Sequence, residues 1–193
     1  TFESLGSTYI KLGQFIASTP SLFPREYVEE FQGCLDQTPT LPFSYIQGVL
    51  NEEFEGRNLN EIFSFIDEKP LASASSAQVH AAKLVTGEDV VIKVQKPGVE
   101  TILYTDLNVV HWATKLLERA VPKIKFASLS EIVDEIKVRM VREVDFIEEA
   151  QNLDDFIQYL NVSGNQAATA PKVYHQFSTR RVLTMQRLYG VSL

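Results

Sequence analysis

Two short runs of β-branched residues around a glycine turn constrain the fold more than any other feature of the sequence. Val79–Val85 and Asp89–Gln95 flank the turn Thr86-Gly87-Glu88. Such runs around a glycine turn are typical of an antiparallel hairpin. A similar run over Ile62–Ile66 precedes the hairpin, and two more follow it, over Ala170–Phe177 and Arg181–Leu188. We therefore expect an antiparallel sheet of about five strands.

Apolar residues at helical spacing predict several helices around these strands. The expected helices run over Leu5–Ile16, Pro24–Leu35, 43–54 and Val99–Ala120. A further helix begins at Ser128 or Ser130 and keeps its apolar period well past Asp145. We expect this long helix to pack across the sheet.

The order of the elements predicts an α+β fold in two parts. Residues 1–58 form a helical N-terminal extension, and residues 59–193 form the domain that contains the sheet. The last strand, from Arg181, runs into an extended segment with Gly190, so we expect more chain to follow.

Composition and charge exclude several classes of function. The formal net charge of −7 opposes binding to a nucleic-acid backbone, and no run of Lys and Arg offsets it locally. The single cysteine, Cys34, has no partner for an internal disulfide, which favours an intracellular, reducing compartment. The three histidines are scattered without metal-ligand spacing, and the apolar stretches are too short to span a membrane.

A stretch of small residues, Ala72–Ala77, lies between two predicted strands. Small residues let the backbone approach a bulky ligand, and N–H groups in such a turn can bind phosphate. An alanine-rich loop still carries Cβ atoms, so it closes over phosphates less freely than a glycine loop. Taken alone, the stretch also fits a surface hairpin with small residues at its tip, which is the commoner case.

Lys93 ends the strand sequence Val90-Val-Ile-Lys93. A lysine at this position can reach under a phosphate-covering loop and neutralise phosphate charge, provided that an anion holds its side chain. A solvated lysine that protects a strand edge would give the same pattern.

The expected long helix carries three carboxylates that could belong to a site. Asp145 and Glu149 are four residues apart and would share one face of that helix, whereas Glu143 would point in another direction. The alternative is a solvated face on which Arg139 and Arg142 pair with Glu143 and Asp145.

The first predicted helix contains the sequence Lys11-Leu-Gly-Gln14. Glycine inside a helix costs about 1 kcal/mol relative to alanine, so Gly13 suggests close approach of another backbone. Lys11 and Gln14 are spaced to reach one external group, although both residue types are ordinary on an exposed helix.

Taken in order, these pieces resemble the UbiB family of atypical protein kinases over nearly the whole chain, from about Leu5 to Gly190. The resemblance rests on four motifs: Lys11-x-Gly-Gln14; the alanine-rich loop 72–76 with Gln78-Val-His80; Lys93 followed by Val-Gln-Lys-Pro-Gly98; and Glu143-x-Asp145 with Glu149-Ala-x-Asn152.

The resemblance implies a kinase-like N-lobe that binds ATP. Lys93 would bind the phosphates and pair with Glu149, and the backbone around the hinge would hold adenine. The implied nucleotide-binding residues are Ala72, Ser73, Ala74, Ser75, Ser76, Lys93, Met185, Gln186 and Leu188. In the family, residues matching Lys11, Gln14, Glu143 and Asp145 obstruct the cleft where a protein substrate would dock.

Several positions depart from the family pattern. Ser73 and Ser76 stand where alanine and a larger aliphatic residue are usual, and Gln186 stands where a hinge glutamate is common. Val91 replaces the alanine of the general kinase motif and would crowd adenine. No His-x-Asp catalytic loop and no Asp-Phe-Gly motif occurs in the sequence, so we expect the C-lobe, with its Mg²⁺ ligands, to be absent from it.

By resemblance, the full-length protein would be an atypical kinase or ATPase that supports isoprenoid-quinone or related lipid metabolism, whereas this fragment alone would be inactive. Its partners would be Mg-ATP, a lipid or quinone precursor and a membrane surface to which it is peripheral. The stretch Lys93-Val-Gln-Lys-Pro-Gly98 is more similar to bacterial and plastid members of the family than to mitochondrial members, which implies a bacterial or plastid protein. The alternative is a non-catalytic, pseudokinase-like scaffold that docks a membrane or a biosynthetic complex.

Overall fold

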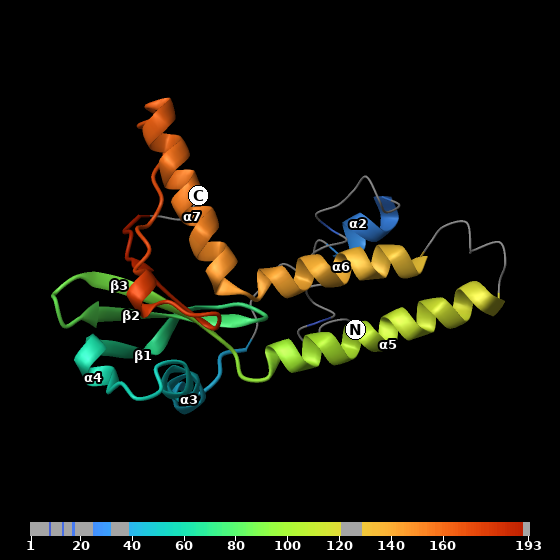
Figure 1. Ribbon diagram of the computed structural model, residues 1–193, viewed down its shortest axis with the longest axis horizontal. Helices are drawn as coiled ribbons and strands as arrows, with labels where there is room; N and C mark the ends of the chain where they lie inside the picture. Colours follow the sequence, from blue (N-terminus) through green and yellow to red (C-terminus); the bar gives the residue numbers. More distant parts are fainter. Residues whose placement is uncertain are drawn as a thin grey trace. The chain divides into compact units, whose positions relative to one another are not determined.

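The computed structural model describes residues 8, 13, 17, 25–31, 39–120 and 129–190 (Figure 1). The chain divides into two units. One comprises Thr1–Thr38 and Gly98–Arg142, and the other comprises Pro39–Pro97 and Glu143–Leu193. The β-strands that the structure describes belong to the second unit.

The sheet of the second unit has four antiparallel strands in the order β1-β2-β3-β4. They are β1 Phe63–Ser73, β2 Ala77–Leu84, β3 Asp89–Gln95 and β4 Val182–Gln186. The predicted hairpin is β2 and β3. In its turn Gly87 has a φ of 103°, a left-handed conformation that glycine adopts without strain, and its N–H donates to the carbonyl of Leu84.

The expected fifth strand is reduced to a single bridge. Within Ala170–Phe177, Val173 pairs with Met185, and the N–H of Tyr174 donates to Thr184 O at 2.9 Å. The segment cannot pair further because Pro171 lacks a backbone donor and the 3₁₀-helix His175–Phe177 (η4) turns the chain away.

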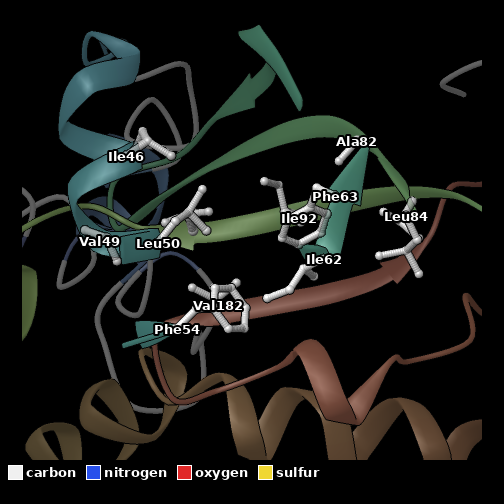
Figure 2. Packing of buried hydrophobic residues seen from close by; sticks show 12 residues of the cluster. Ile46, Val49, Leu50, Phe54, Ile62, Phe63, Ala82, Leu84, Ile92 and Val182 are labelled. Carbon is white, nitrogen blue, oxygen red and sulfur yellow. The ribbon is translucent and has the colours of Figure 1, made fainter. Parts of the chain in front are cut away.

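Helices cover both faces of the sheet (Figure 1). Even-numbered residues of β2, β3 and β4 point toward α3 (Phe43–Glu53) and α4 (Leu59–Ile62), where a continuous apolar core forms. Figure 2 shows Ile46, Val49 and Leu50 of α3 against Ile92 and Val182. Thus α3, which lies within the predicted extension 1–58, supplies part of the core of the sheet.

The opposite face of the sheet packs against α7 (Phe146–Ser163). Odd-numbered strand residues point this way, and Ala77 and Leu183 form a buried cluster with Phe146, Ala150 and Val173. The sheet therefore has an extensive apolar core on one face and a smaller one on the other.

The prediction of a single long helix that continues past Asp145 is wrong. There are two helices, α6 (Leu129–Glu143) and α7, separated by Val144 and Asp145. Asp145 is the N-cap of α7: its backbone is extended, and its carboxylate accepts from the N–H of Ile147 at 3.0 Å. Asp145 and Glu149 therefore do not share a helix face, because Asp145 precedes the helix.

The first unit is helical in the part that the structure describes, with α2 (Arg25–Phe31), α5 (Val99–Ala120) and most of α6. The bounds of α5 are those expected from its apolar period. Its buried residues are Val99, Leu103 and Leu107, and α6 buries Val133, Ile136 and Met140. A hydrogen bond from Lys137 Nζ to Asn108 Oδ1, 2.6 Å long, joins α6 to α5.

Two buried polar residues of β2 fasten the segments beside the sheet. The Gln78 amide both accepts from the N–H of Leu41 and donates to its carbonyl. The same Gln78 nitrogen lies 3.3 Å from His80 Nε2, and His80 Nδ1 lies 2.8 Å from the carbonyl of Asp67. Because that carbonyl can only accept, Nδ1 of His80 carries a proton, and because the Gln78 nitrogen can only donate, Nε2 carries none, so the ring is neutral.

Burial makes the folded protein sensitive to protonation of His80. The pKa of His80 is below its ordinary value of 6.5 because burial disfavours the charged ring. Below about pH 6.5 the unfolded state binds the proton more readily, so the free energy of unfolding falls as the pH decreases. In His80→Asn, which has no titrating ring, urea unfolding between about pH 7.5 and 5.5 should show a smaller decrease. An equal decrease in both proteins would contradict this assignment.

The cap of α7 can be tested in the same assay. Asp145→Ala should lower the free energy of unfolding by about 1 kcal/mol, because the N–H of Ile147 loses its acceptor. Asp145→Asn retains a side-chain oxygen acceptor and should remain within a few tenths of a kcal/mol of the wild type. Equal losses in the two variants would show that the carboxylate charge matters rather than the cap.

Candidate functional site

Lys93 and Glu149 form an ion pair between the sheet and α7. Lys93 Nζ lies 2.8 Å from Oε1 and 2.7 Å from Oε2 of Glu149, so the ammonium contacts both carboxylate oxygens. The side chains are 25% and 35% exposed, respectively. The pair therefore lies at the margin of the sheet–helix interface, with part of each group open to solvent.

Alternation along β3 and the start of α7 explain why these two residues meet. Lys93 is odd-numbered and so points toward α7, whereas Ile92 and Val94 are fully buried on the α3 face. Glu149 is in the first turn of α7. Lys93 Nζ also lies over the buried ring of Phe146, 4.9 Å from the ring centroid, a distance at which the face of the ring stabilises the cation.

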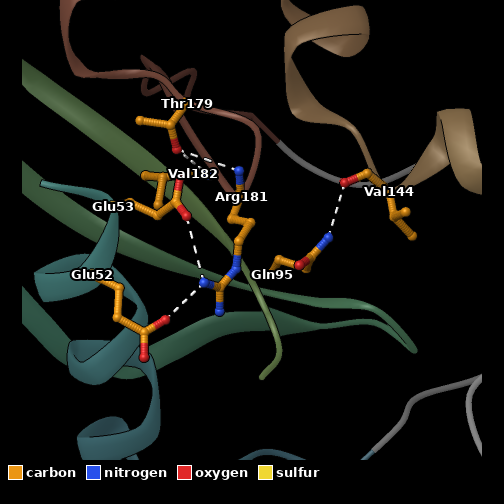
Figure 3. Close-up of polar contacts among 7 residues, drawn as sticks. All are labelled: Glu52, Glu53, Gln95, Val144, Thr179, Arg181 and Val182. Atoms are coloured by element: carbon orange, nitrogen blue, oxygen red, sulfur yellow. Dashed lines mark hydrogen bonds and ion pairs between the residues drawn. The ribbon is translucent and has the colours of Figure 1, made fainter. Parts of the chain in front are cut away.

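The N-terminus of α7 is attached to the ends of two strands. The N–H of Phe146 donates to Arg180 O at 3.0 Å, just before β4. The buried side chain of Gln95, at the end of β3, donates to Val144 O at 3.0 Å (Figure 3). These bonds fix the position from which the first turn of α7 presents Glu149.

An apolar patch lies next to Lys93 on the same face of the sheet. Val91 precedes Lys93 by two residues and pairs with Ala81 on one side and Met185 on the other. Val79 lies directly across from Lys93 on β2. Val79, Val91 and Met185 are each half-buried, so the patch is accessible in part.

The alanine-rich loop lies at the other end of this face. Ala72 and Ser73 end β1, and Ala74, Ser75 and Ser76 connect it to β2. The N–H of Ala74 donates within the turn to Ala77 O at 2.8 Å, and Ser76 O accepts from the N–H of Lys96. Ser75 and Ser76 are buried, so the loop is closely attached to the sheet.

The predicted hinge follows β4. The N–H of Gln186 donates to Lys172 O at 2.8 Å, and that of Arg187 donates to Asp89 O at 3.1 Å. Both amides therefore serve the fold, and Leu188 is the next residue whose N–H could contact a ligand. The side chain of Leu188 is exposed.

The predicted cleft-gating residues are only partly within the described structure. Lys11 and Gln14 lie outside the described residues, although Gly13 between them is helical and buried. Glu143 is the last residue of α6. Asp145 caps α7 and accepts from Arg180 Nε at 3.1 Å, so its carboxylate already has a structural role.

Three residues that organise the site were not predicted from the sequence: Gln95, Phe146 and Arg180. A usable signal was present, because Asp145-Phe-Ile-Glu148 has the spacing of a helix-capping motif and indicates a new helix start. Nothing in the sequence indicated that Gln95 reaches Val144, since the contact joins positions 49 apart.

Two further observations limit the chemistry of the described part. Within residues 39–120 and 129–190 and the short described stretches before them, no cluster of three His, Cys, Asp or Glu side chains could hold a metal ion. None of the helices described there is long and apolar enough to cross a membrane.

Comparison with known sequences gives the family. Residues 33–193 match the ABC1 atypical kinase-like domain. The chain is 52% identical, over its whole length, to an uncharacterized chloroplastic aarF domain-containing protein kinase of Arabidopsis thaliana, and covers 36% of that protein. It is 36% identical over 98% of its length to the probable protein kinase UbiB of Azotobacter vinelandii, of which it covers 35%.

A solved structure supports the same relationship. A Mycobacterium tuberculosis protein, solved as a complex with erythromycin, matches with a TM-score of 0.67 and 29% identity. The match covers 93% of this chain and 44% of the other. This chain spans about a third of the length of its curated relatives. The predicted resemblance is confirmed, and the chain belongs to the ABC1 atypical kinase-like family, whose members include the UbiB kinases.

Proposed function

We propose that this chain forms the nucleotide-binding front of an atypical kinase or ATPase that uses Mg-ATP. The observation that carries the proposal is the contact of Lys93 with both carboxylate oxygens of Glu149. In kinases a strand lysine paired with a glutamate of the following helix orients the nucleotide phosphates. Lys93 and Glu149 are the two residues to which we assign this catalytic role.

The order of groups along the sheet face supports the same proposal. The hinge residue Gln186 pairs with Val90, the apolar patch surrounds Val91, Lys93 follows, and the alanine-rich loop lies beyond it. Val90 and Lys93 are three residues apart, about 10 Å along a strand. A nucleotide extended along β3 would place its base on the apolar patch and its phosphates at Lys93 and residues 72–76.

The two ends of such a ligand would be held differently. The carbonyl of Gln186 and the N–H of Leu188 would bind the base edge, and the half-buried Met185 and Val91 would contact its faces. When bound, Mg²⁺ would neutralise charge on the phosphate oxygens. We assign its ligands to a C-lobe beyond this chain. Lys93 would balance a further part of the phosphate charge.

The relatives support a role in isoprenoid-quinone or related lipid metabolism. They include a chloroplastic protein and bacterial proteins named UbiB. We propose that the full-length protein acts on a lipid or quinone precursor at a membrane surface in a plastid or a bacterium.

A scaffold that docks a lipid surface is a second candidate. Apolar side chains at helical spacing are exposed along α5: Val109 is 61%, Trp112 69% and Leu116 68% exposed. Large exposed apolar patches mark interaction surfaces. This observation favours docking whether or not the protein turns over nucleotide.

Nucleotide binding is tested with the full-length protein. Lys93→Ala should abolish Mg-ATP turnover and weaken Mg-ATP binding by about tenfold to a hundredfold, because a charge-assisted contact to phosphate is lost. Glu149→Gln should weaken binding less, since Lys93 keeps its charge but loses its ionic partner. Isothermal titration calorimetry and phosphate release would measure both effects.

The control is Lys69→Ala, which removes an exposed lysine of β1 that has no place in the proposed site. It should bind Mg-ATP as the wild type does. Wild-type affinity and turnover in Lys93→Ala would overturn the assignment of Lys93.

The docking candidate is tested by liposome sedimentation. Val109→Ser and Leu116→Ser together should reduce the fraction of full-length protein that sediments with anionic liposomes, because the apolar stripe is shortened. Tyr45, on α3, is also largely exposed, and Tyr45→Ser serves as the control. Equal sedimentation of all three proteins would exclude α5 as the docking surface.

A further inference from the structure

Gln95 is a buried amide whose presence the apolar core does not explain. It is 2% exposed at the end of β3, and its Nε2 donates to Val144 O at 3.0 Å (Figure 3). Val144 precedes the N-cap of α7, so no N–H within that helix is placed to bond its carbonyl. A buried amide is unfavourable unless it makes such a bond. The side chain therefore serves the break between α6 and α7.

Gln95 and Lys93, both on β3, contact the chain at the start of α7. They are two residues apart on β3 and point to the same face, about 7 Å from each other. Their partners lie close together in sequence: Val144 just before the N-cap of α7, and Glu149 in its first turn. The bond at Gln95 therefore holds the chain immediately before the turn that presents Glu149 to Lys93.

The main chain reinforces this attachment on the side of β4. The N–H of Gln95 donates to Arg181 O at 2.9 Å, and the N–H of Phe146 donates to Arg180 O at 3.0 Å. Adjacent carbonyls before β4 thus bind the end of β3 and the start of α7. The Gln95 side chain adds a bond from β3 to Val144, in the segment that leads into α7.

We propose that Gln95 is a positioning residue of the nucleotide site, which fixes the N-terminus of α7 and so holds Glu149 against Lys93. The inference rests on the proposed function. Without the amide, Val144 O loses its donor, and the first turn of α7 moves away from the sheet in a fraction of molecules. Lys93 then spends part of its time without its carboxylate partner.

The test replaces the amide by an apolar side chain of similar volume, Gln95→Met, in the full-length protein. Mg-ATP affinity is measured by calorimetry, and amide hydrogen exchange is followed along α7. We expect Mg-ATP binding to weaken by about tenfold or more and exchange over 147–152 to become faster, with little change in the last two turns of α7. A general loss of stability would instead accelerate exchange throughout the helix.

The matched control is Thr184→Val. Thr184 is fully buried and points to the α3 face, where its hydroxyl donates to Phe177 O at 2.6 Å. This variant also leaves a backbone carbonyl without its side-chain donor but does not touch α7. It should lose stability and keep both the Mg-ATP affinity and the exchange rates of α7.

The outcomes separate the two proposals. Wild-type Mg-ATP affinity in Gln95→Met, alongside loss of binding in Lys93→Ala, overturns the positioning role and leaves the nucleotide site intact. If the wild type itself binds no Mg-ATP, the proposed function fails, and hydrogen exchange decides alone. Unchanged exchange over 147–152 in Gln95→Met then overturns the positioning role, whereas selective acceleration supports it.

Discussion

A charged ammonium group on a largely covered sheet face needs an anion within reach, and the structure is arranged to meet this requirement at Lys93. The anion comes from another segment of the chain, 56 residues along the sequence. The position of this anion, the Glu149 carboxylate, depends on the N-cap at Asp145 and on the attachment of Val144 and Phe146 to the strand ends. It also depends on the rotation of α7 about its own axis. A shift of α7 by one residue would turn Glu149 by about 100° and separate the pair.

The two faces of the sheet differ in what holds them. Toward α3 the buried apolar side chains form a large cluster (Figure 2), beside which Gln78, His80 and Thr184 make buried polar contacts. Toward α7 the apolar cluster is small, and directional polar contacts carry much of the attachment. Close-packed apolar contacts resist deformation, whereas a few hydrogen bonds can break and re-form together. The α3 face is therefore the larger apolar interface, and the attachment of α7 depends more on a few directional contacts.

Local patterns in the sequence predicted much of the fold. The bounds of β3 and α5 and the turn at Gly87 agree with the structure, because period and turn chemistry are local properties. The contact of Lys93 with Glu149, which the structure also shows, was predicted from the family resemblance and not from a local pattern. The break at Asp145 was missed because Val141, Val144 and Ile147 continue an apolar spacing across it. Pro171 and η4 shortened the expected fifth strand. The nucleotide-binding roles of residues 72–76 and of the hinge remain predictions.

The pairing of β3 with β4 has a consequence for how the chain is made. Residues 96–181 separate these strands, so β4 cannot join the sheet until it has left the ribosome. The same delay applies to Arg181, which binds Glu52 and Glu53 at the end of α3, up to 129 positions earlier (Figure 3). Contacts so distant in sequence form slowly. During synthesis the edge of β3 that pairs with β4, and the sheet face that packs against α7, stay uncovered until those later elements emerge. An unpaired strand edge and uncovered apolar surface make this interval the one most prone to aggregation.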